Sequence, residues 1–150
     1  DSVLDRFTQR VKRSYRKVEE VDQVKAKEIH YVAEDNLYMS GENTVVTASD
    51  PTGHAEMLAI REAAATIGSE RLTDCDLYVT LEPCAMCAAA ISFARIRRLY
   101  YGASDPKGGA VDNGVRFFSS PTCHHRPDIY GGVGESEAAQ LLRDFFKARR

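Results

Sequence analysis

One histidine, one glutamate and two cysteines have the types and the spacing of a metal site that does chemistry. His54 and Glu56 are separated by one residue, and Pro83 precedes the pair Cys84 and Cys87. Imidazole nitrogen and thiolate sulfur are ligands that zinc prefers, whereas a carboxylate two residues from a ligand is better placed to move protons. Three protein ligands leave one position of a tetrahedral ion open to water, as in catalytic sites. The sequence therefore predicts one zinc ion per chain, bound by the histidine and both cysteines, with Glu56 as the proton carrier.

The elements around these residues explain how they can meet. The turn at 50–53 offers N-cap side chains to a helix that should run to about Ile67, where Gly68 fits its C-terminal stop. Pro83 suits the start of a second helix, expected to run to about Ala94, on which residues three apart lie on one face. The positive end of a helix dipole also lowers a thiol pKa and favours the thiolate. We therefore expect the N-termini of two helices to converge on the metal.

A carboxylate beside an activated water supports hydrolysis at an electron-poor ring carbon. The water attacks the carbon, Glu56 passes protons to a ring nitrogen and to the leaving amine, and ammonia departs. Alone, Glu56 would be interpreted as a first-turn carboxylate that complements the helix dipole. The three ligands beside it favour the catalytic role.

The remaining pattern alternates strands with helices. Apolar residues three and four apart predict an amphipathic helix over 3–20. Further elements are expected as strands at 27–33, 36–47, 77–81 and 98–102, a mostly irregular stretch at 104–134 with a helical turn near 111–117, and a terminal helix at 135–150. We find no repeat or linker and expect one α/β domain over residues 1–150, with helices on both faces of a sheet.

Composition narrows the class of protein. The chain has 150 residues and a formal net charge of −2, no apolar run long enough to span a bilayer, and no recognisable signal peptide, so we expect a cytoplasmic protein without membrane contact. Basic residues cluster only locally, at 95–98 and 147–150, so an RNA role needs evidence besides charge. Cys75 and Cys123 are isolated, and we expect small buried side chains there rather than disulfides.

The metal-site residues, in their order, resemble the cytidine deaminase superfamily. Residues 43–150 are similar to bacterial tRNA adenosine deaminases, hydrolases that convert a wobble adenosine of tRNA to inosine. The similarity lies in DPTGHAE at 50–56, LYVTLEPCAMC at 77–87, GASDPKGGA at 102–110 and DFFKARR at 144–150. The resemblance implies a cytidine deaminase-like fold, a three-layer α/β/α sandwich around a five-stranded mixed sheet. It also implies a homodimer whose active sites are completed across the interface.

The resemblance implies substrate-binding residues as well. Asn43 matches a family residue that holds the target base, and Asp105 matches a loop residue near the substrate backbone. The terminal helix, which meets the RNA in the family, is matched by Phe145, Arg149 and Arg150. Taken alone, Asn43 would be a turn residue, Asp105 a cap or Asx-turn, and Phe145 a core residue. An anticodon loop already presents unstacked bases, so the implied partner is a tRNA anticodon stem-loop.

Other functions stay open at this point. The same chemistry could act on cytosine, guanine or a free nucleoside, although the basic end of the terminal helix favours a polynucleotide. A zinc-stabilised binding domain without activity would need a fourth protein ligand, for which Cys123, His124 and His125 are the candidates. A thioredoxin-like role for the C-x-x-C pair is disfavoured by the upstream His-x-Glu and by Pro83.

Overall fold

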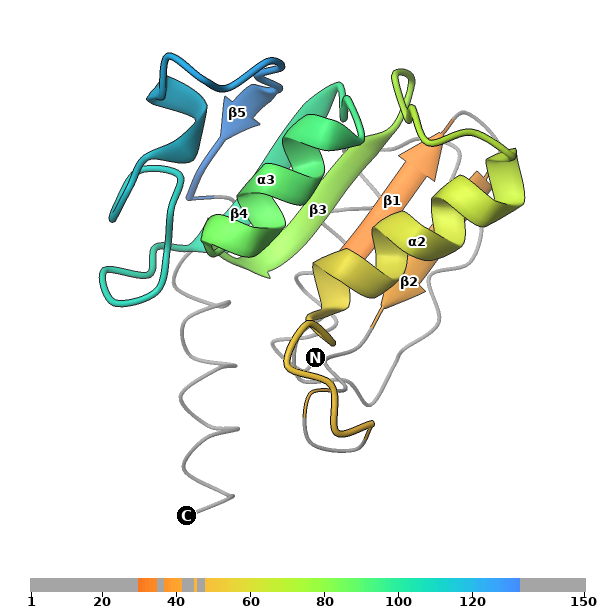
Figure 1. Cartoon of the computed structure of the whole chain (residues 1–150), viewed down its shortest axis with the longest axis horizontal. Helices are drawn as coiled ribbons and strands as arrows, with labels where there is room; N and C mark the ends of the chain where they lie inside the picture. Colours follow the sequence, from red (N-terminus) through yellow and green to blue (C-terminus); the bar gives the residue numbers. More distant parts are fainter. Residues whose placement is uncertain (1–29, 35–36, 42–44, 46–47, 133–150) are drawn as a thin grey trace.

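A central sheet with two helices on one face makes up the part of the chain that the computed structural model describes (Figure 1). The described residues are 30–34, 37–41, 45 and 48–132. The strands are β1 (His30–Glu34), β2 (Leu37–Gly41), β3 (Asp76–Leu81), β4 (Arg98–Ala103) and β5 (Asp128–Tyr130). The helices are α2 (Ala55–Ile67), α3 (Ala85–Phe93) and the 3-10 helix η1 (Phe117–Ser119). Within this part, no helix has the length and apolar character needed to cross a membrane.

The sheet is mixed and has the strand order β2-β1-β3-β4-β5. Strand β1 runs antiparallel to both β2 and β3, whereas β3, β4 and β5 run parallel. Parallel neighbours need a crossover, and α3 supplies the one between β3 and β4. The chain is therefore an α/β protein, and the strand after Pro83 lies beside the strand before it.

Alternate residues of strands β3 and β4 face the helices and form the core. The buried side chains of the sheet pack against small side chains of both helices: Leu77, Val79, Leu99 and Tyr101 from the strands, Ala59 and Ala63 from α2, and Ala88 and Ile91 from α3. Alanines let the helix backbones approach the sheet and each other closely, so the helix positions are tightly set. This packing fixes where the two helices begin.

Helix α2 has the predicted bounds, whereas helix α3 begins later than predicted. Helix α2 ends at Gly68, whose φ of 76° places it in the left-handed region and whose N–H donates to the Ala64 carbonyl. Helix α3 begins at Ala85, two residues after Pro83. The Pro83 carbonyl instead accepts the N–H of Ala110 at 2.8 Å, which holds the proline in the connection before the helix.

The stretch expected to be irregular contains a strand. Strand β5 pairs with β4, with Arg98 opposite Asp128 and Leu99 opposite Ile129. Three residues at a sheet edge are too few to give a periodic pattern, which explains why the sequence did not reveal them. The helical turn near 111–117 lies later, at Phe117–Ser119. The helices predicted at 3–20 and 135–150 fall outside the described residues.

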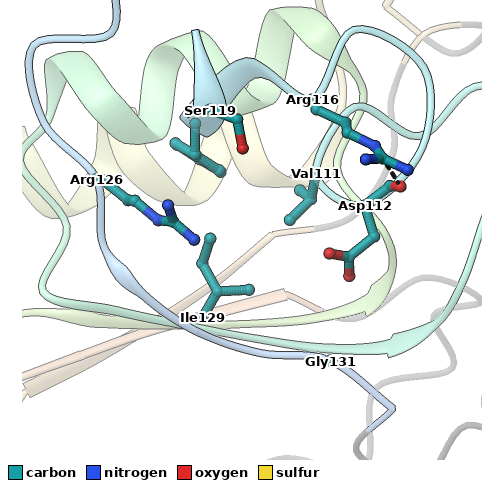
Figure 2. A pocket seen from close by; sticks show the side chains of 8 residues that line it. Val111, Asp112, Arg116, Ser119, Arg126, Ile129 and Gly131 are labelled. Atoms are coloured by element: carbon teal, nitrogen blue, oxygen red, sulfur yellow. Dashed lines mark hydrogen bonds between the residues drawn. The ribbon is translucent and has the colours of Figure 1, made fainter.

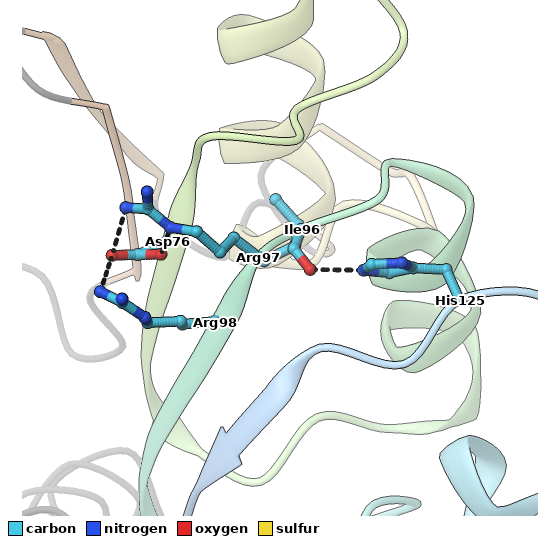
Figure 3. A network of polar contacts seen from close by, with 5 residues as sticks. All are labelled: Asp76, Ile96, Arg97, Arg98 and His125. Carbon is cyan, nitrogen blue, oxygen red and sulfur yellow. Dashed lines mark hydrogen bonds and ion pairs between the residues drawn. The ribbon is translucent and has the colours of Figure 1, made fainter.

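A buried ion pair joins the start of β3 to the start of β4 (Figure 3). The Asp76 side chain is 1% exposed and accepts hydrogen bonds from Arg97 Nε at 2.9 Å and Nη2 at 3.1 Å. Arg98 Nη1 lies 3.7 Å from the same carboxylate. Two of the three arginines in the basic cluster at 95–98 are therefore held by an internal carboxylate.

Replacing Arg97 with leucine should destabilise the protein, because it leaves the buried Asp76 carboxylate with only the longer contact to Arg98. Breaking a buried pair costs about 3–5 kcal/mol, and the partial exposure of Arg97 places the expected loss near the lower end. Urea unfolding of the zinc-loaded protein measures it. Arg71→Leu, on the surface, is the matched control and should change stability by less than about 0.5 kcal/mol. Equal stabilities of the two variants would contradict this interpretation.

Candidate active site

His54, Cys84 and Cys87 meet at the N-termini of α2 and α3. His54 and Cys84 are the N-cap residues of the two helices and have extended backbones, with ψ of 146° and 175°. The Nδ1 atom of His54 lies 3.6 Å from the Sγ atom of each cysteine. All three donor atoms lie within 4.8 Å of one another, and no other such cluster occurs among residues 30–34, 37–41, 45 and 48–132.

The cluster fits zinc in donor chemistry and in size. One imidazole and two thiols form a borderline-to-soft donor set. Zinc bonds of about 2.0–2.3 Å place the nitrogen and sulfur corners of a tetrahedron roughly 3.6 Å apart. The observed spacing between nitrogen and sulfur therefore matches two corners that share an ion.

The two thiols differ in proton affinity. The hydrogen bond from the Cys87 thiol, more than the nearby charge of His54, lowers the pKa of Cys84 to about 5 against the opposing effect of burial. The pKa of Cys87 is raised by its role as donor to Cys84, by burial, and by the carboxylate of Glu56. Zinc binds both sulfurs as thiolates, so binding of the metal releases the thiol protons.

Glu56 lies beside the cluster. It occupies the first turn of α2, is buried, and accepts a hydrogen bond of 3.4 Å from Cys87 Sγ to its Oε2 atom. A buried carboxylate next to, and separate from, three metal donors can exchange protons with a molecule that binds there.

The other predicted site residues are mostly outside the described part of the chain. Asn43 lies in 42–44, and Phe145, Arg149 and Arg150 lie in 133–150, so their roles stay predictions. Asp105 is described and forms an Asx-type turn. Its Oδ1 atom accepts the backbone N–H groups of Lys107 at 3.1 Å and Gly108 at 3.0 Å. Its contact with substrate is untested.

The candidates for a fourth metal ligand bind elsewhere. Cys123 Sγ donates to the backbone carbonyl of His125 at 3.1 Å, and His125 Nε2 lies 2.7 Å from the carbonyl oxygen of Ile96. His124 is exposed and His125 is half-buried. Within the described residues, the cluster therefore has three protein donors and no fourth.

Glu82, which is not among the predicted site residues, fastens the loop that follows β4. Its carboxylate is almost fully buried, and both oxygens accept hydrogen bonds from the loop. Oε1 accepts from Ser104 Oγ at 3.4 Å, the Asp105 N–H at 3.1 Å and Asn113 Nδ2 at 2.7 Å. Oε2 accepts the backbone N–H groups of Val111 at 3.1 Å, Asp112 at 3.2 Å and Asn113 at 3.1 Å. An acidic residue between an apolar strand and Pro83 was the available signal, because a charge there needs partners.

These bonds couple the 104–113 loop to the metal-binding segment. Glu82 is two residues before Cys84, and the loop also donates from Ala110 to the carbonyl of the intervening Pro83. Gly109 is required here, because a Cβ at that position would clash with the Glu82 carboxylate and the Asp105 carbonyl. Burial alone would raise the pKa of Glu82, but its hydrogen bonds outweigh burial and hold that pKa below its ordinary value.

The chain is similar to zinc-dependent deaminases. The family model described as "Cytidine and deoxycytidylate deaminase zinc-binding region" matches residues 6–103, so the similarity extends beyond the predicted span of 43–150. A tRNA-specific adenosine deaminase of Agrobacterium fabrum (strain C58 / ATCC 33970) is 69% identical over 102 residues, 68% of this chain and 67% of that protein. Another, from Rickettsia typhi (strain ATCC VR-144 / Wilmington), is 46% identical over 122 residues, 81% of this chain and 82% of that protein.

A solved structure has the same fold. It is described as "Biochemical and Structural Studies of A-to-I Editing by tRNA:A34 Deaminases at the Wobble Position of Transfer RNA". It aligns with a TM-score of 0.76 at 52% identity, covering 92% of this chain and 99% of that one. The predicted cytidine deaminase-like α/β fold is confirmed.

Replacing Glu82 with glutamine should loosen the 104–113 loop, because an amide nitrogen cannot accept the hydrogen bonds that one carboxylate oxygen receives. Bonds to a charged group contribute about 1.5–3 kcal/mol each, and we expect a net loss of about 2 kcal/mol near neutral pH. Urea unfolding measures this loss, and hydrogen exchange should show faster exchange of the Val111 and Asp112 amides. Glu62→Gln, on the exposed side of α2, is the matched control.

The pH dependence of the loss has a defined sign. Because the pKa of Glu82 is lowered in the folded state, its contribution is present above the unfolded pKa, near 4.3, and is lost as the pH falls through the lower folded value. The stability difference between the wild type and Glu82→Gln should therefore be constant above about pH 5.5 and shrink in more acidic solution. A difference that stays unchanged throughout acidification would contradict the carboxylate's role.

Proposed function

Because the chain belongs to the cytidine and deoxycytidylate deaminase zinc-binding family, we propose that it hydrolyses the wobble adenosine of a tRNA anticodon loop to inosine. The observation that carries the chemistry is the buried Glu56 carboxylate beside one imidazole and two thiols that fit a single zinc ion. The similarity to tRNA-specific adenosine deaminases supports the substrate. The absence of a fourth donor near the cluster, within the described residues, favours an enzyme over a zinc-stabilised binding domain.

Each residue of the cluster has one task in this reaction. His54, Cys84 and Cys87 hold the zinc ion, which supplies Lewis acidity and can lower the pKa of a water to about 7. Glu56 accepts a proton from the attacking water and delivers protons to a ring nitrogen of adenine and then to the departing amine. Its burial keeps this carboxylate beside the reacting atoms and away from bulk solvent.

The substrate base must leave its stack to reach a buried carboxylate. The free energy of unstacking is small in an anticodon loop, where bases are already unstacked. The 104–113 loop is hydrogen-bonded through Glu82 and Pro83 to the metal-binding segment, and Asp105 belongs to that loop. We assign Asp105 and Asn43 to substrate positioning, and the Phe145, Arg149 and Arg150 group to contact with the RNA. A tRNA substrate also supports a cytoplasmic location.

We extend the proposal to the architecture and the assembly. Tyr78 and Thr80 are buried but lie outside the core cluster between sheet and helices, which supports a third layer on the opposite face. The helices predicted at 3–20 and 135–150 would form it within a single domain of 1–150 around the five-stranded sheet. A homodimer, which the resemblance to bacterial tRNA adenosine deaminases implies, completes the proposal.

Replacing Glu56 with glutamine should abolish turnover while leaving the metal in place. General acid–base groups contribute about 10²–10⁴ in rate, and the glutamine side chain cannot carry the proton. Inosine formed in an anticodon stem-loop, mapped by mass, measures the loss. Glu62→Gln, on the same helix but exposed, should keep full activity. Unaltered turnover by Glu56→Gln would remove the carboxylate from the mechanism, and wild-type release of ammonia only from cytosine or guanine would reject the substrate.

Replacing Cys84 with serine should remove the zinc. Changes around a metal's ligands already cost about 10–100-fold in affinity, so loss of a ligand should cost at least about 100-fold. Elemental analysis should find one zinc per chain in the wild type and much less in the variant. Cys123→Ser is the matched control, because Cys123 binds a backbone carbonyl and not the cluster. Zinc retained at full occupancy by Cys84→Ser would contradict the ligand set.

A further inference from the structure

A polar cavity of about 470 Å³ that is open to solvent lies between η1 and β5, apart from the three metal donors (Figure 2). Its polar side chains are exposed. Arg116 enters it from the segment before η1, and Arg126 enters it from the segment before β5. Asp112 and Ser119 add a carboxylate and a hydroxyl, while Ile129 contributes an apolar wall. The volume is within the range of small-molecule sites, and two guanidinium groups favour an anionic ligand.

The two arginines of the cavity are available to a ligand, unlike those at the start of β4. Arg116 Nε donates to the Asp112 carbonyl oxygen at 3.2 Å, which anchors the guanidinium while its two Nη groups can still donate. No hydrogen bond or ion pair joins the Arg126 guanidinium to another residue in the described part of the chain. Arg97 and Arg98, by contrast, are bound to the buried Asp76.

The backbone of Arg116 sets the direction from which its side chain starts. It lies in the left-handed region, with φ of 45° and ψ of 60°, as the N-cap of η1. Ser49 and Arg95 have positive φ as well and line no part of the cavity, so the case for a ligand depends on the side chains.

The cavity and the metal cluster share one rigid connection. Val111 and Asp112, which line the cavity, donate their N–H groups to Glu82, and Ala110 donates to Pro83. Counting about 3.8 Å per residue along this path places Asp112 within about 20 Å of Cys84. A separation of this size is short enough for one RNA stem-loop to span.

We propose that the cavity binds a nucleotide of the RNA strand outside the deaminated adenosine. Phosphates of the strand would pair with Arg116 and with Arg126, which lie on opposite sides of the cavity (Figure 2) and whose planar forks match phosphate oxygens. Asp112 makes a bare anion a poor ligand, but its carboxylate can accept from a ribose hydroxyl or a base amino group. This assignment rests on the proposed RNA substrate and adds a second contact to it.

The test is Arg116→Gln with Arg126→Gln, separately and together, assayed on an anticodon stem-loop. The double variant should raise KM about tenfold with kcat within about twofold, because phosphate contacts bind substrate without touching the reacting atoms. The salt dependence of log(kcat/KM) should become shallower by about one unit for each arginine. Arg126→Lys should keep most of the salt dependence but recover only part of KM, because it keeps the charge and loses the fork.

Arg71→Gln, an exposed arginine outside the cavity, is the matched control and should leave KM unchanged. A double variant with wild-type KM and salt dependence would overturn the proposal, as would an equal effect of Arg71→Gln. Direct titration of a fluorescent stem-loop separates this proposal from the catalytic one. Weaker binding by the double variant supports RNA binding at the cavity whether or not the wild-type protein forms inosine. Equal binding by both proteins contradicts it.

Discussion

The chemistry of the site depends on holding one nitrogen and two sulfur atoms at the spacing of three corners of a tetrahedron. Two of these donors belong to N-cap residues, His54 and Cys84, whose extended backbones turn into helices at that point. An N-cap side chain lies at the positive end of its helix, where backbone N–H groups favour a thiolate and other negative charge. Alanines along both helices let them pack closely on the sheet, so the spacing between nitrogen and sulfur is set by the core. The metal site is in this sense a consequence of helix packing.

A second constraint is the burial of Glu82. An ionised carboxylate taken out of water costs several kcal/mol unless hydrogen bonds replace the lost hydration. Here the loop after β4 supplies them, chiefly with backbone N–H groups that have no partner in a helix or strand. The same bonds therefore satisfy the loop's own donors and the carboxylate. The loop acquires a fixed shape next to the metal ligands, although it contains little regular secondary structure.

Features that depend on residues close together in the sequence were predictable, whereas features that depend on distant contacts were not. The helix ending at Gly68, the strand at Leu77–Leu81 and the three-donor cluster follow from caps, apolar runs and ligand spacing, all of which act over a few residues. The partners of Glu82 are 22 to 31 residues away, and no short pattern reveals such contacts. Strand β5 likewise depends on its pairing with β4 rather than on its own composition. The predicted first residue of α3 was wrong, because the Pro83 carbonyl accepts a hydrogen bond from Ala110 and Pro83 stays outside the helix.

The partners of the arginines also could not be predicted from the sequence. They determine which cations of a chain with a net charge of −2 remain able to bind phosphates. The most conspicuous basic cluster, at 95–98, gives two of its charges to Asp76, where they stabilise the edge of the core. Arg116 and Arg126 are ten residues apart in sequence and form no recognisable motif, yet the turn around η1 brings them to one cavity. Affinity for a polyanion depends on cations that remain able to pair with phosphates. Charge counted along the sequence therefore overestimates the contribution of the 95–98 cluster and overlooks the second group, Arg116 and Arg126. Hydrogen bonds to Glu82 and Pro83 connect Asp112, which lines the cavity together with that second group, to the segment that carries the metal donors.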